Sequence, residues 1–269
     1  MATLVLTAVG TALGGPIGGA LCALIGQQVD QNILFKPKGR DGPRLQELAV
    51  QTSSYGSQIP RLYGKMRVAG TVIWATDLKE TRASSGGGKG RPKSTIYSYS
   101  ACLAVALSSR TIKSIGRIWA DGKIFRGSAG DFKTETGFRF YQGHEDQAAD
   151  GLMASAEAAG GTPAYRGLAL AIFEDMDLSD YGNRIPSLTF EIIADDGTVN
   201  LGAIVDDISG NAVTAIVDEQ LHGFSATGQD RREALQVMSD SFSLSFTSVS
   251  DMIFARPRQF DQDAEILSL

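Results

Sequence analysis

The first 29 residues carry no charged side chain, and Asp30 is the first charged residue of the sequence. Large apolar residues recur there at steps of three or four, which predicts a helix with one apolar stripe. That stripe is Leu6, Val9, Leu13, Ile17, Leu21 and Leu24. Small residues form two rows between them: Gly10, Gly14 and Gly18 in one, and Gly15, Gly19 and Ala23 in the other. Rows of this kind let helix backbones approach closely.

Gly14-Gly15-Pro16 interrupts this pattern, because proline removes a helical hydrogen bond and glycine favours a turn. We therefore expect a kinked helix or a short helical hairpin. More than twenty neutral residues satisfy a membrane span by count, although glycine and alanine dilute the hydrophobicity. Packing against other protein and contact with lipid both stay open as interpretations of this segment.

From residue 45 the pattern changes to strands and turns. Residues 71–77 are rich in β-branched and aromatic side chains, and residues 97–107 alternate large and small over eleven positions. Asp121-Gly122 separates two apolar runs and predicts a hairpin. Further strands are expected at 138–141, 168–173, 188–193, 242–249 and 252–256, and helices at 152–159 and 201–208.

A third helix is predicted after Asp230, which can cap it while Glu233 occupies the third position. The fold class is therefore mainly β (α+β). We expect a helical segment over 1–44, a β-rich domain over 45–197, and a second α+β domain over 198–269 that need not be complete. The boundary is set by Asp-Asp-Gly near 195–198.

Charge is distributed unevenly along the chain. Residues 1–100 hold twelve Lys and Arg against five Asp and Glu, so the remaining 169 residues hold thirteen against twenty-five. Residues 82–94 combine four cations with glycine and serine, which predicts a long exposed loop between two strands. Its basic residues are Arg82, Lys89, Arg91 and Lys93. They are either a solvated tip or a contact for nucleic acid or an acidic surface.

Motifs for cofactor or metal chemistry fail on spacing. Lys89 is followed by glycine instead of Ser or Thr, so no phosphate loop is present, and residues 10–19 do not match a dinucleotide fingerprint. His144 and His222 lack the partners of a zinc site, and Cys22 and Cys102 show no disulfide or metal spacing. We expect no catalytic residues, no cofactor and no bound metal.

Asp175, Asp177 and Ser179 are spaced like alternate ligands of a calcium loop, but the glycine and glutamate that such a loop needs are misplaced. A carbohydrate-acting enzyme using this acidic cluster is the weakest hypothesis.

Five blocks of the sequence resemble the phage tail-tip protein family, in particular the large "megatron" hub proteins of gene transfer agents and related phages. The longest runs from Ala164 to Glu191 and contains Ile-Phe-Glu-Asp-Met-Asp-Leu-Ser-Asp-Tyr-Gly-Asn-Arg-Ile-Pro. The others are residues 56–67, 72–77, 97–123 and 139–146. The glycine-rich N-terminal run also looks like the opening segment of that family.

The resemblance implies a homotrimeric hub with tail-tube-like β-barrel domains, at the distal end of a virion tail, made in the bacterial cytoplasm. Paired domains in three copies would present six units to a six-fold tube. Implied partners are distal tail, hub, tape-measure and cell-wall peptidase proteins, a transient host membrane, and DNA that passes without specific binding. The hub would join tube to tip, close the channel with its N-terminal segment, and take part in DNA delivery.

The large members of that family continue into a TIM-barrel-like region and receptor-binding domains, for which 269 residues have no room. Receptor recognition is therefore not carried over. The alternative function is a membrane-active, pore-forming protein, suggested by the neutral N-terminal segment.

Overall fold

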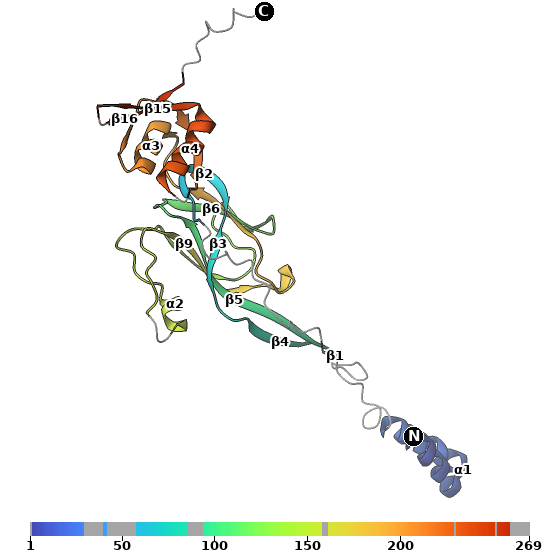
Figure 1. The fold of residues 1–269 in the computed structure, drawn as a ribbon. Helices are drawn as coiled ribbons and strands as arrows, with labels where there is room; N and C mark the ends of the chain where they lie inside the picture. Colours follow the sequence, from blue (N-terminus) through green and yellow to red (C-terminus); the bar gives the residue numbers. More distant parts are fainter. Residues whose placement is uncertain are drawn as a thin grey trace, which may run out of the picture. The chain divides into compact units, whose positions relative to one another are not determined.

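The computed structural model describes residues 2–29, 40–41, 58–85, 94–157, 161–228, 230–250 and 252–258. The chain divides into two compact units: Met1–Glu47 with Glu80–Tyr99, and Leu48–Lys79 with Ser100–Leu269. The predicted mainly β class is confirmed, since most described elements are strands in antiparallel sheets (Figure 1). The tail-tube-like arrangement and the predicted domain boundaries stay predictions.

The first unit contains α1 (Ala2–Val29), β1 (Arg40–Asp41), β4 (Lys79–Ser85) and the beginning of β5 (Ser94–Ser108). β4 and β1 both pair with β5, and β1 runs parallel to it. Residues 82–85, predicted as the start of a loop over 82–94, belong instead to strand β4, and Ser94 is the first residue of β5. Residues 86–93 lie outside the described residues.

Two sheets build the larger core of the second unit. The first has the order β1-β5-β9-β8, with β3 also on β5, and the second has the order β14-β2-β10-β6-β7. In the first sheet the further strands are β3 (Thr71–Ala75), β8 (Gly137–Tyr141) and β9 (Ala169–Asp177). In the second they are β2 (Arg61–Ala69), β6 (Ser114–Ala120), β7 (Lys123–Arg126), β10 (Leu188–Ile193) and β14 (Gly223–Ala226).

The period-two pattern of β5 explains how it is buried on both faces. Leu103, Val105 and Leu107 belong to the main core, which also contains residues of the second sheet. Ala104 points the other way, into a small cluster with Met153 of α2 (Gly151–Ala156) and Ile172 of β9. The expected strand over 97–107 is thus confirmed, and the small side chain at 104 fits this cluster.

Most other predicted elements are confirmed with small shifts. Asp121 and Gly122 both have positive φ, 48° and 80°, which matches the tight turn expected between β6 and β7. The described part of the helix predicted over 152–159 is α2. The strand expected from residue 242 begins instead at Leu244, because α4 (Arg231–Phe242) continues through Phe242 and ends at Ser243 in the left-handed conformation.

A second, smaller core contains α3 (Leu201–Ser209), α4 and a three-stranded sheet ordered β12-β16-β15. Its strands are β12 (Val213–Ala215), β15 (Leu244–Val249) and β16 (Met252–Pro257). A two-stranded ladder joins β11 (Val199–Asn200) to β13 (Gln220–Leu221), and a 3-10 turn spans Ser179–Tyr181. Asp230 caps α4 as predicted, accepting a hydrogen bond from the Glu233 amide at 2.8 Å.

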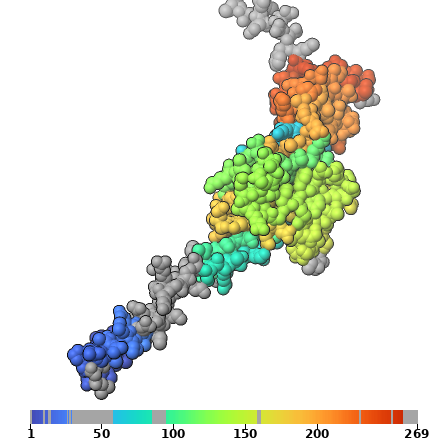
Figure 2. Space-filling model, turned by 180° about the vertical axis from the view of Figure 1, so that it is seen from behind, coloured from blue at the N-terminus to red at the C-terminus, as the bar shows by residue number. Residues whose placement is uncertain are grey.

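The two cores of the second unit meet at Tyr63 on β2. β14 pairs with β2, and Tyr63 is 2% exposed within the smaller core although its strand belongs to the larger one. Figure 2 shows the residues of the smaller core, in orange and red, directly beside those of the larger one, in green and yellow. The Tyr63 hydroxyl donates to Asp207 at 2.7 Å, and burial together with this carboxylate raises the pKa of Tyr63. Arg110 lies over the Tyr63 ring and binds Asp195 through two hydrogen bonds of 2.8 Å. The outer face of the five-stranded sheet is therefore covered at one end.

Candidate functional site

α1 is a helical hairpin, as Gly14-Gly15-Pro16 predicted. Gly15 has φ 61° and ψ −158°, a combination that essentially only glycine adopts, and the chain reverses there before Pro16. The two arms lie side by side in Figure 1. Gly19 is buried, and a Cβ at this position would collide with Cγ2 of Thr11 on the other arm. The glycine row therefore lets the arms approach closely.

Most described members of the large apolar stripe do not pack between the arms. Val9, Ile17, Leu21 and Leu24 are exposed, and Leu6 is half-buried. Gly18 is half-buried, and the surroundings of Gly10, Leu13 and Gly14 lie outside the described residues. Among the side chains of α1 that the structure describes, seven aliphatic ones are exposed by about half or more: Leu4, Val5, Val9, Ile17, Leu21, Leu24 and Ile25. An apolar surface of this kind calls for a partner surface.

No helix among the described residues combines the length and the hydropathy needed to cross a bilayer. The role predicted for the stripe in channel closing or membrane contact stays a prediction.

Of the four basic residues in the predicted loop, only Arg82 is among the described residues. Arg82 lies on β4, where it donates to Glu80 at 2.9 Å and stands 5.7 Å from the ring centre of Tyr97. Arg82 is thus part of a strand and contacts side chains of β4 and β5, whereas a loop position was predicted. Lys89, Arg91 and Lys93 lie outside the described residues.

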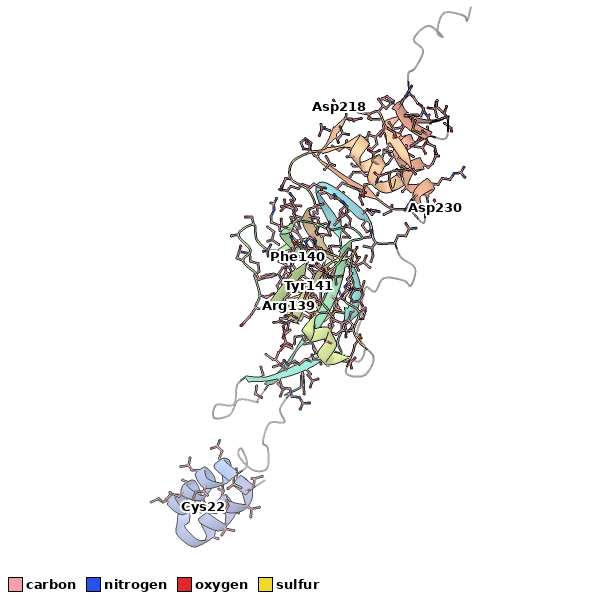
Figure 3. All side chains as sticks on the ribbon, turned by 90° about the vertical axis from the view of Figure 1, so that its left-hand side faces the viewer. Cys22, Arg139, Phe140, Tyr141, Asp218 and Asp230 are labelled. Atoms are coloured by element: carbon pink, nitrogen blue, oxygen red, sulfur yellow. The ribbon has the colours of Figure 1, made fainter. Side chains whose placement is uncertain are left out.

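The acidic cluster considered for calcium or carbohydrate chemistry is occupied by local contacts. Asp175 binds the ammonium of Lys79 at 3.1 Å, and Asp177 accepts a hydrogen bond from the Ser179 amide at 2.9 Å. Among the described residues, no three His, Cys, Asp or Glu side chains are grouped closely enough to hold a metal ion. Cys22 on α1 is half-buried (Figure 3), and Cys102 is buried on β5.

Arg139 and Tyr141, both half-buried on β8 (Figure 3), bind the buried carboxylate of Asp150 at the start of α2. The Asp150 carboxylate accepts from Arg139 and from the Tyr141 hydroxyl, each at 2.8 Å, and also caps α2. Burial tends to raise the pKa of Asp150, but these donors outweigh it and hold the pKa below its usual value. These contacts hold α2 against the sheet, and the Asp150 carboxylate is fully engaged by them.

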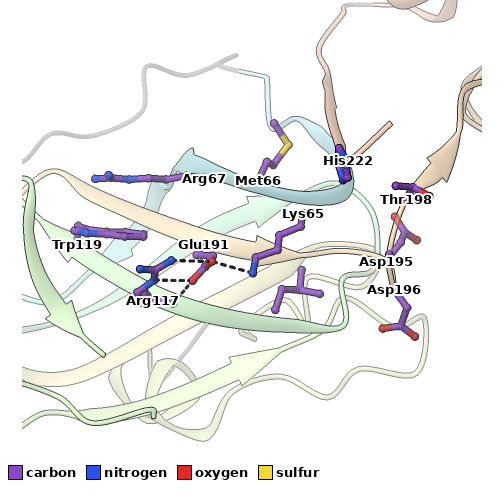
Figure 4. A pocket seen from close by; sticks show the side chains of 12 residues that line it. Lys65, Met66, Arg67, Arg117, Trp119, Glu191, Asp195, Asp196, Thr198 and His222 are labelled. Carbon is purple, nitrogen blue, oxygen red and sulfur yellow. Dashed lines mark hydrogen bonds and ion pairs between the residues drawn. The ribbon is translucent and has the colours of Figure 1, made fainter. Parts of the chain in front are cut away.

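A groove lies on the outer face of the five-stranded sheet (Figure 4). Its volume is about 750 Å³. It is lined by Lys65, Met66, Arg67, Arg117, Trp119, Glu191, Ile193, Asp195, Asp196, Gly197, Thr198 and His222. Strands β2, β10 and β6 supply most of these residues, because alternate side chains of each strand point away from the core. The smaller core covers the sheet at Tyr63 but does not reach Lys65, so the groove stays open.

Glu191 is the electrostatic centre of the groove. It accepts from the backbone and the side chain of Arg117 at 3.1 Å and binds the Lys65 ammonium at 3.1 Å. The Arg117 side chain and backbone hydrogen bonds, together with Lys65, lower the pKa of Glu191 to about 2. Glu191 is therefore ionised at neutral pH and holds two of the three groove cations in place.

Arg67 has a different arrangement. Its guanidinium lies 3.9 Å from the ring centre of Trp119, and its Nε and Nη2 donate to the Thr189 hydroxyl at 3.1 and 2.9 Å. Arg117 lies 5.6 Å from the same indole ring. Trp119 is thus flanked by two guanidinium groups, a geometry that orients both planes.

Sequence reasoning missed this groove. Its residues come from positions 65–67, 117–119, 191–198 and 222, which only strand pairing brings together. The available signal was the polar residue at every second position of each strand, including Arg67, Arg117 and Glu191, but that pattern also describes an ordinary solvated face.

Comparison with solved structures finds a chain described as "Virion of native gene transfer agent (GTA) particle". The TM-score is 0.58 and the sequence identity 28%, and the alignment covers 94% of this chain. It covers 64% of the other chain, so this sequence spans less than two thirds of that neighbour. No family model matches the sequence, and neither does any curated protein. The chain is therefore similar in fold and sequence to a component of a gene transfer agent virion.

Proposed function

We propose that this protein is a structural component of a phage-like tail tip. The observation that carries the proposal is the similarity to a gene transfer agent virion chain along 94% of the sequence. That similarity supports a structural role in a virion, in assembly with other virion proteins. The proposal goes further: three copies form a hub that joins the tail tube to the distal tip.

The α1 hairpin supports a role in closing the channel. An isolated chain leaves at least the seven described aliphatic side chains of α1 in water, whereas three hairpins converging on an axis would bury them against each other. The same hairpins would have to separate when DNA leaves the particle. Their surface is apolar and uncharged, so it offers no ion pairs that would hold them together against such a change.

Imaging of assembled particles tests the location. A gold-labelled tag on the protein should appear only at the distal end of the tail, and averaged images should show threefold symmetry there. Label along the tube or on the head would contradict the hub.

Deletion of residues 2–29 tests the channel role. We expect particles that assemble with normal morphology but lose packaged DNA or fail to deliver it. The matched control is Lys123→Ala on the surface of β7, which should leave delivery unchanged. Normal DNA retention and delivery by the deletion particles would exclude channel closing by α1.

A membrane-active, pore-forming protein is the second candidate, favoured by the same exposed aliphatic side chains. The purified protein would then release dye from liposomes, and Leu21→Asp would abolish the leakage. A protein that leaves liposomes intact but is essential for particle assembly supports the hub instead.

A further inference from the structure

We propose that the groove on the outer face of the five-stranded sheet binds an acidic segment of a neighbouring protein subunit. The inference rests on the proposed function only in that the chain must stand beside other subunits. It does not require a tail tip, a trimer or a channel.

The charges in the groove favour an anionic occupant. Lys65, Arg67 and Arg117 are exposed, while Glu191 is the only carboxylate among the groove residues on the three strands. The two aspartates at the end of the groove are paired with cations that do not line it: Asp195 with Arg110 at 2.8 Å, and Asp196 with Lys113. The strand surface therefore has two positive charges in excess.

Arg67 is the position where a carboxylate fits best. Its Nε and Nη2 are oriented by Thr189 and its plane by Trp119, and no carboxylate of the described residues is paired with this guanidinium. A planar, pre-oriented guanidinium binds carboxylates well, because less side-chain freedom is lost on binding. Arginine and tryptophan are also the residues that most often dominate the binding energy of protein interfaces.

The apolar lining adds a second requirement. Met66 and Ile193 are half-buried and lie beside the charged residues, and Trp119 exposes part of its indole. The fitting occupant is a chain segment that places an Asp or Glu on Arg67 and an aliphatic or aromatic side chain near Trp119.

The same features disfavour DNA as the occupant. Two of the three cations are already bound to Glu191, whose ionised carboxylate stands in the middle of the groove and repels a continuous row of phosphates. Acidic protein segments are abundant by contrast. Residues 101–269 of each copy of this chain alone hold twenty-five Asp and Glu against thirteen Lys and Arg.

Site-specific photo-crosslinking in assembled particles tests the proposal. His222 is exposed and lines the groove, so His222→p-benzoylphenylalanine places a reactive ketone there. Irradiation followed by mass spectrometry should identify one crosslinked peptide of a virion protein or of another copy, rich in Asp or Glu. The same group at Lys123, an exposed position that does not line the groove, should not give that peptide.

A charge reversal provides the second arm. Arg67→Glu should reduce the yield of that crosslinked peptide at least tenfold while the melting temperature of the purified protein stays within about 2 °C, and Lys123→Glu should change neither. A crosslink to DNA, to a neutral or basic peptide, or to nothing would overturn the proposal. Particle imaging reports on the hub separately, so either proposal can fail while the other stands.

Discussion

The α1 hairpin and the main β core use the same kinds of side chain in opposite ways. Leu107 on β5 is 0% exposed between two sheets, whereas Leu21 on α1 is 59% exposed. The core closes on itself because two sheets present complementary faces to each other. Two short helices have only one seam, and glycine fills that seam, so the large residues are left outside. An apolar sequence therefore predicts burial, but not whether the cover comes from the same chain.

The sharpest way to test self-contained burial is a large truncation inside the β core. Phe173 is 0% exposed, and its ring centre lies 5.2 Å from that of Phe138, 5.9 Å from Phe125 and 6.3 Å from Phe190. Phe173→Ala should lower the free energy of unfolding by about 3–5 kcal/mol, because it removes apolar contacts and leaves a cavity. Urea unfolding of the purified protein measures this. A loss below 1 kcal/mol would mean that the two sheets do not share this core.

The groove differs from both the β core and the α1 hairpin, because its surface is polar and its side chains are held by ion pairs. Glu191→Gln should cost about 1–2 kcal/mol at pH 7, because Arg117 and Lys65 lose their charged partner. The pKa of Glu191 is lowered from 4.5 to about 2, so its contribution is complete above pH 4.5 and is lost as the pH falls toward 2.

Urea midpoints of the original protein and of Glu191→Gln should therefore converge between pH 4.5 and 2. A constant difference across that range would show that the charge of Glu191 is not the source of the effect.

Packing within the hairpin can be tested by one methyl group. Gly19→Ala should destabilise α1 by about 1 kcal/mol, because the new Cβ meets Cγ2 of Thr11. Thr11→Ser removes that methyl group, so the double variant should exceed the original in helix stability, since alanine is the better helix former. Hydrogen exchange of residues 2–29 reports this locally. Equal protection of the amide hydrogens of residues 2–29 in all variants would contradict a close contact between Gly19 and Thr11 on the two arms.

The smallest effect is expected at the exposed stripe. Leu21→Ser should change the free energy of unfolding of the purified protein by less than about 0.5 kcal/mol, as for most exposed positions. In assembled particles the same change should impair DNA retention or delivery. If both measurements stay unchanged, the exposed surface of α1 has no partner in the particle, and the claim that another subunit buries it is wrong.

Local patterns were sufficient for the elements that local chemistry controls. The Asp-Gly turn, the Asp230 cap and the reversal at Gly15 each depend on residues within a few positions of one another, and each is confirmed. The end of α4 was misjudged because Phe242 suits either a helix or a strand, and its partner Phe224 in the smaller core lies 18 residues earlier.

The groove and the meeting of the two cores depend on partners that sequence spacing does not reveal. Tyr63 is buried in the smaller core and donates a hydrogen bond to Asp207 of α3, 144 residues later in the chain, while Lys65 and Arg67 on the same face of β2 stay open. Nothing in the alternation of β2 distinguishes these three positions. The difference arises only from where α3 and its Asp207 end up in the fold.

The backbone of Gly15 also determines the reach of the N-terminal segment. At 1.5 Å per residue, each arm of the folded hairpin extends about 20 Å, whereas an unbroken helix of the same residues would measure about 40 Å. Since φ 61° with ψ −158° is open to glycine almost alone, one methyl group at this position penalises the fold-back, while Pro16 still kinks any continuous helix. A single small residue thus sets how far the segment can project and keeps its two ends side by side.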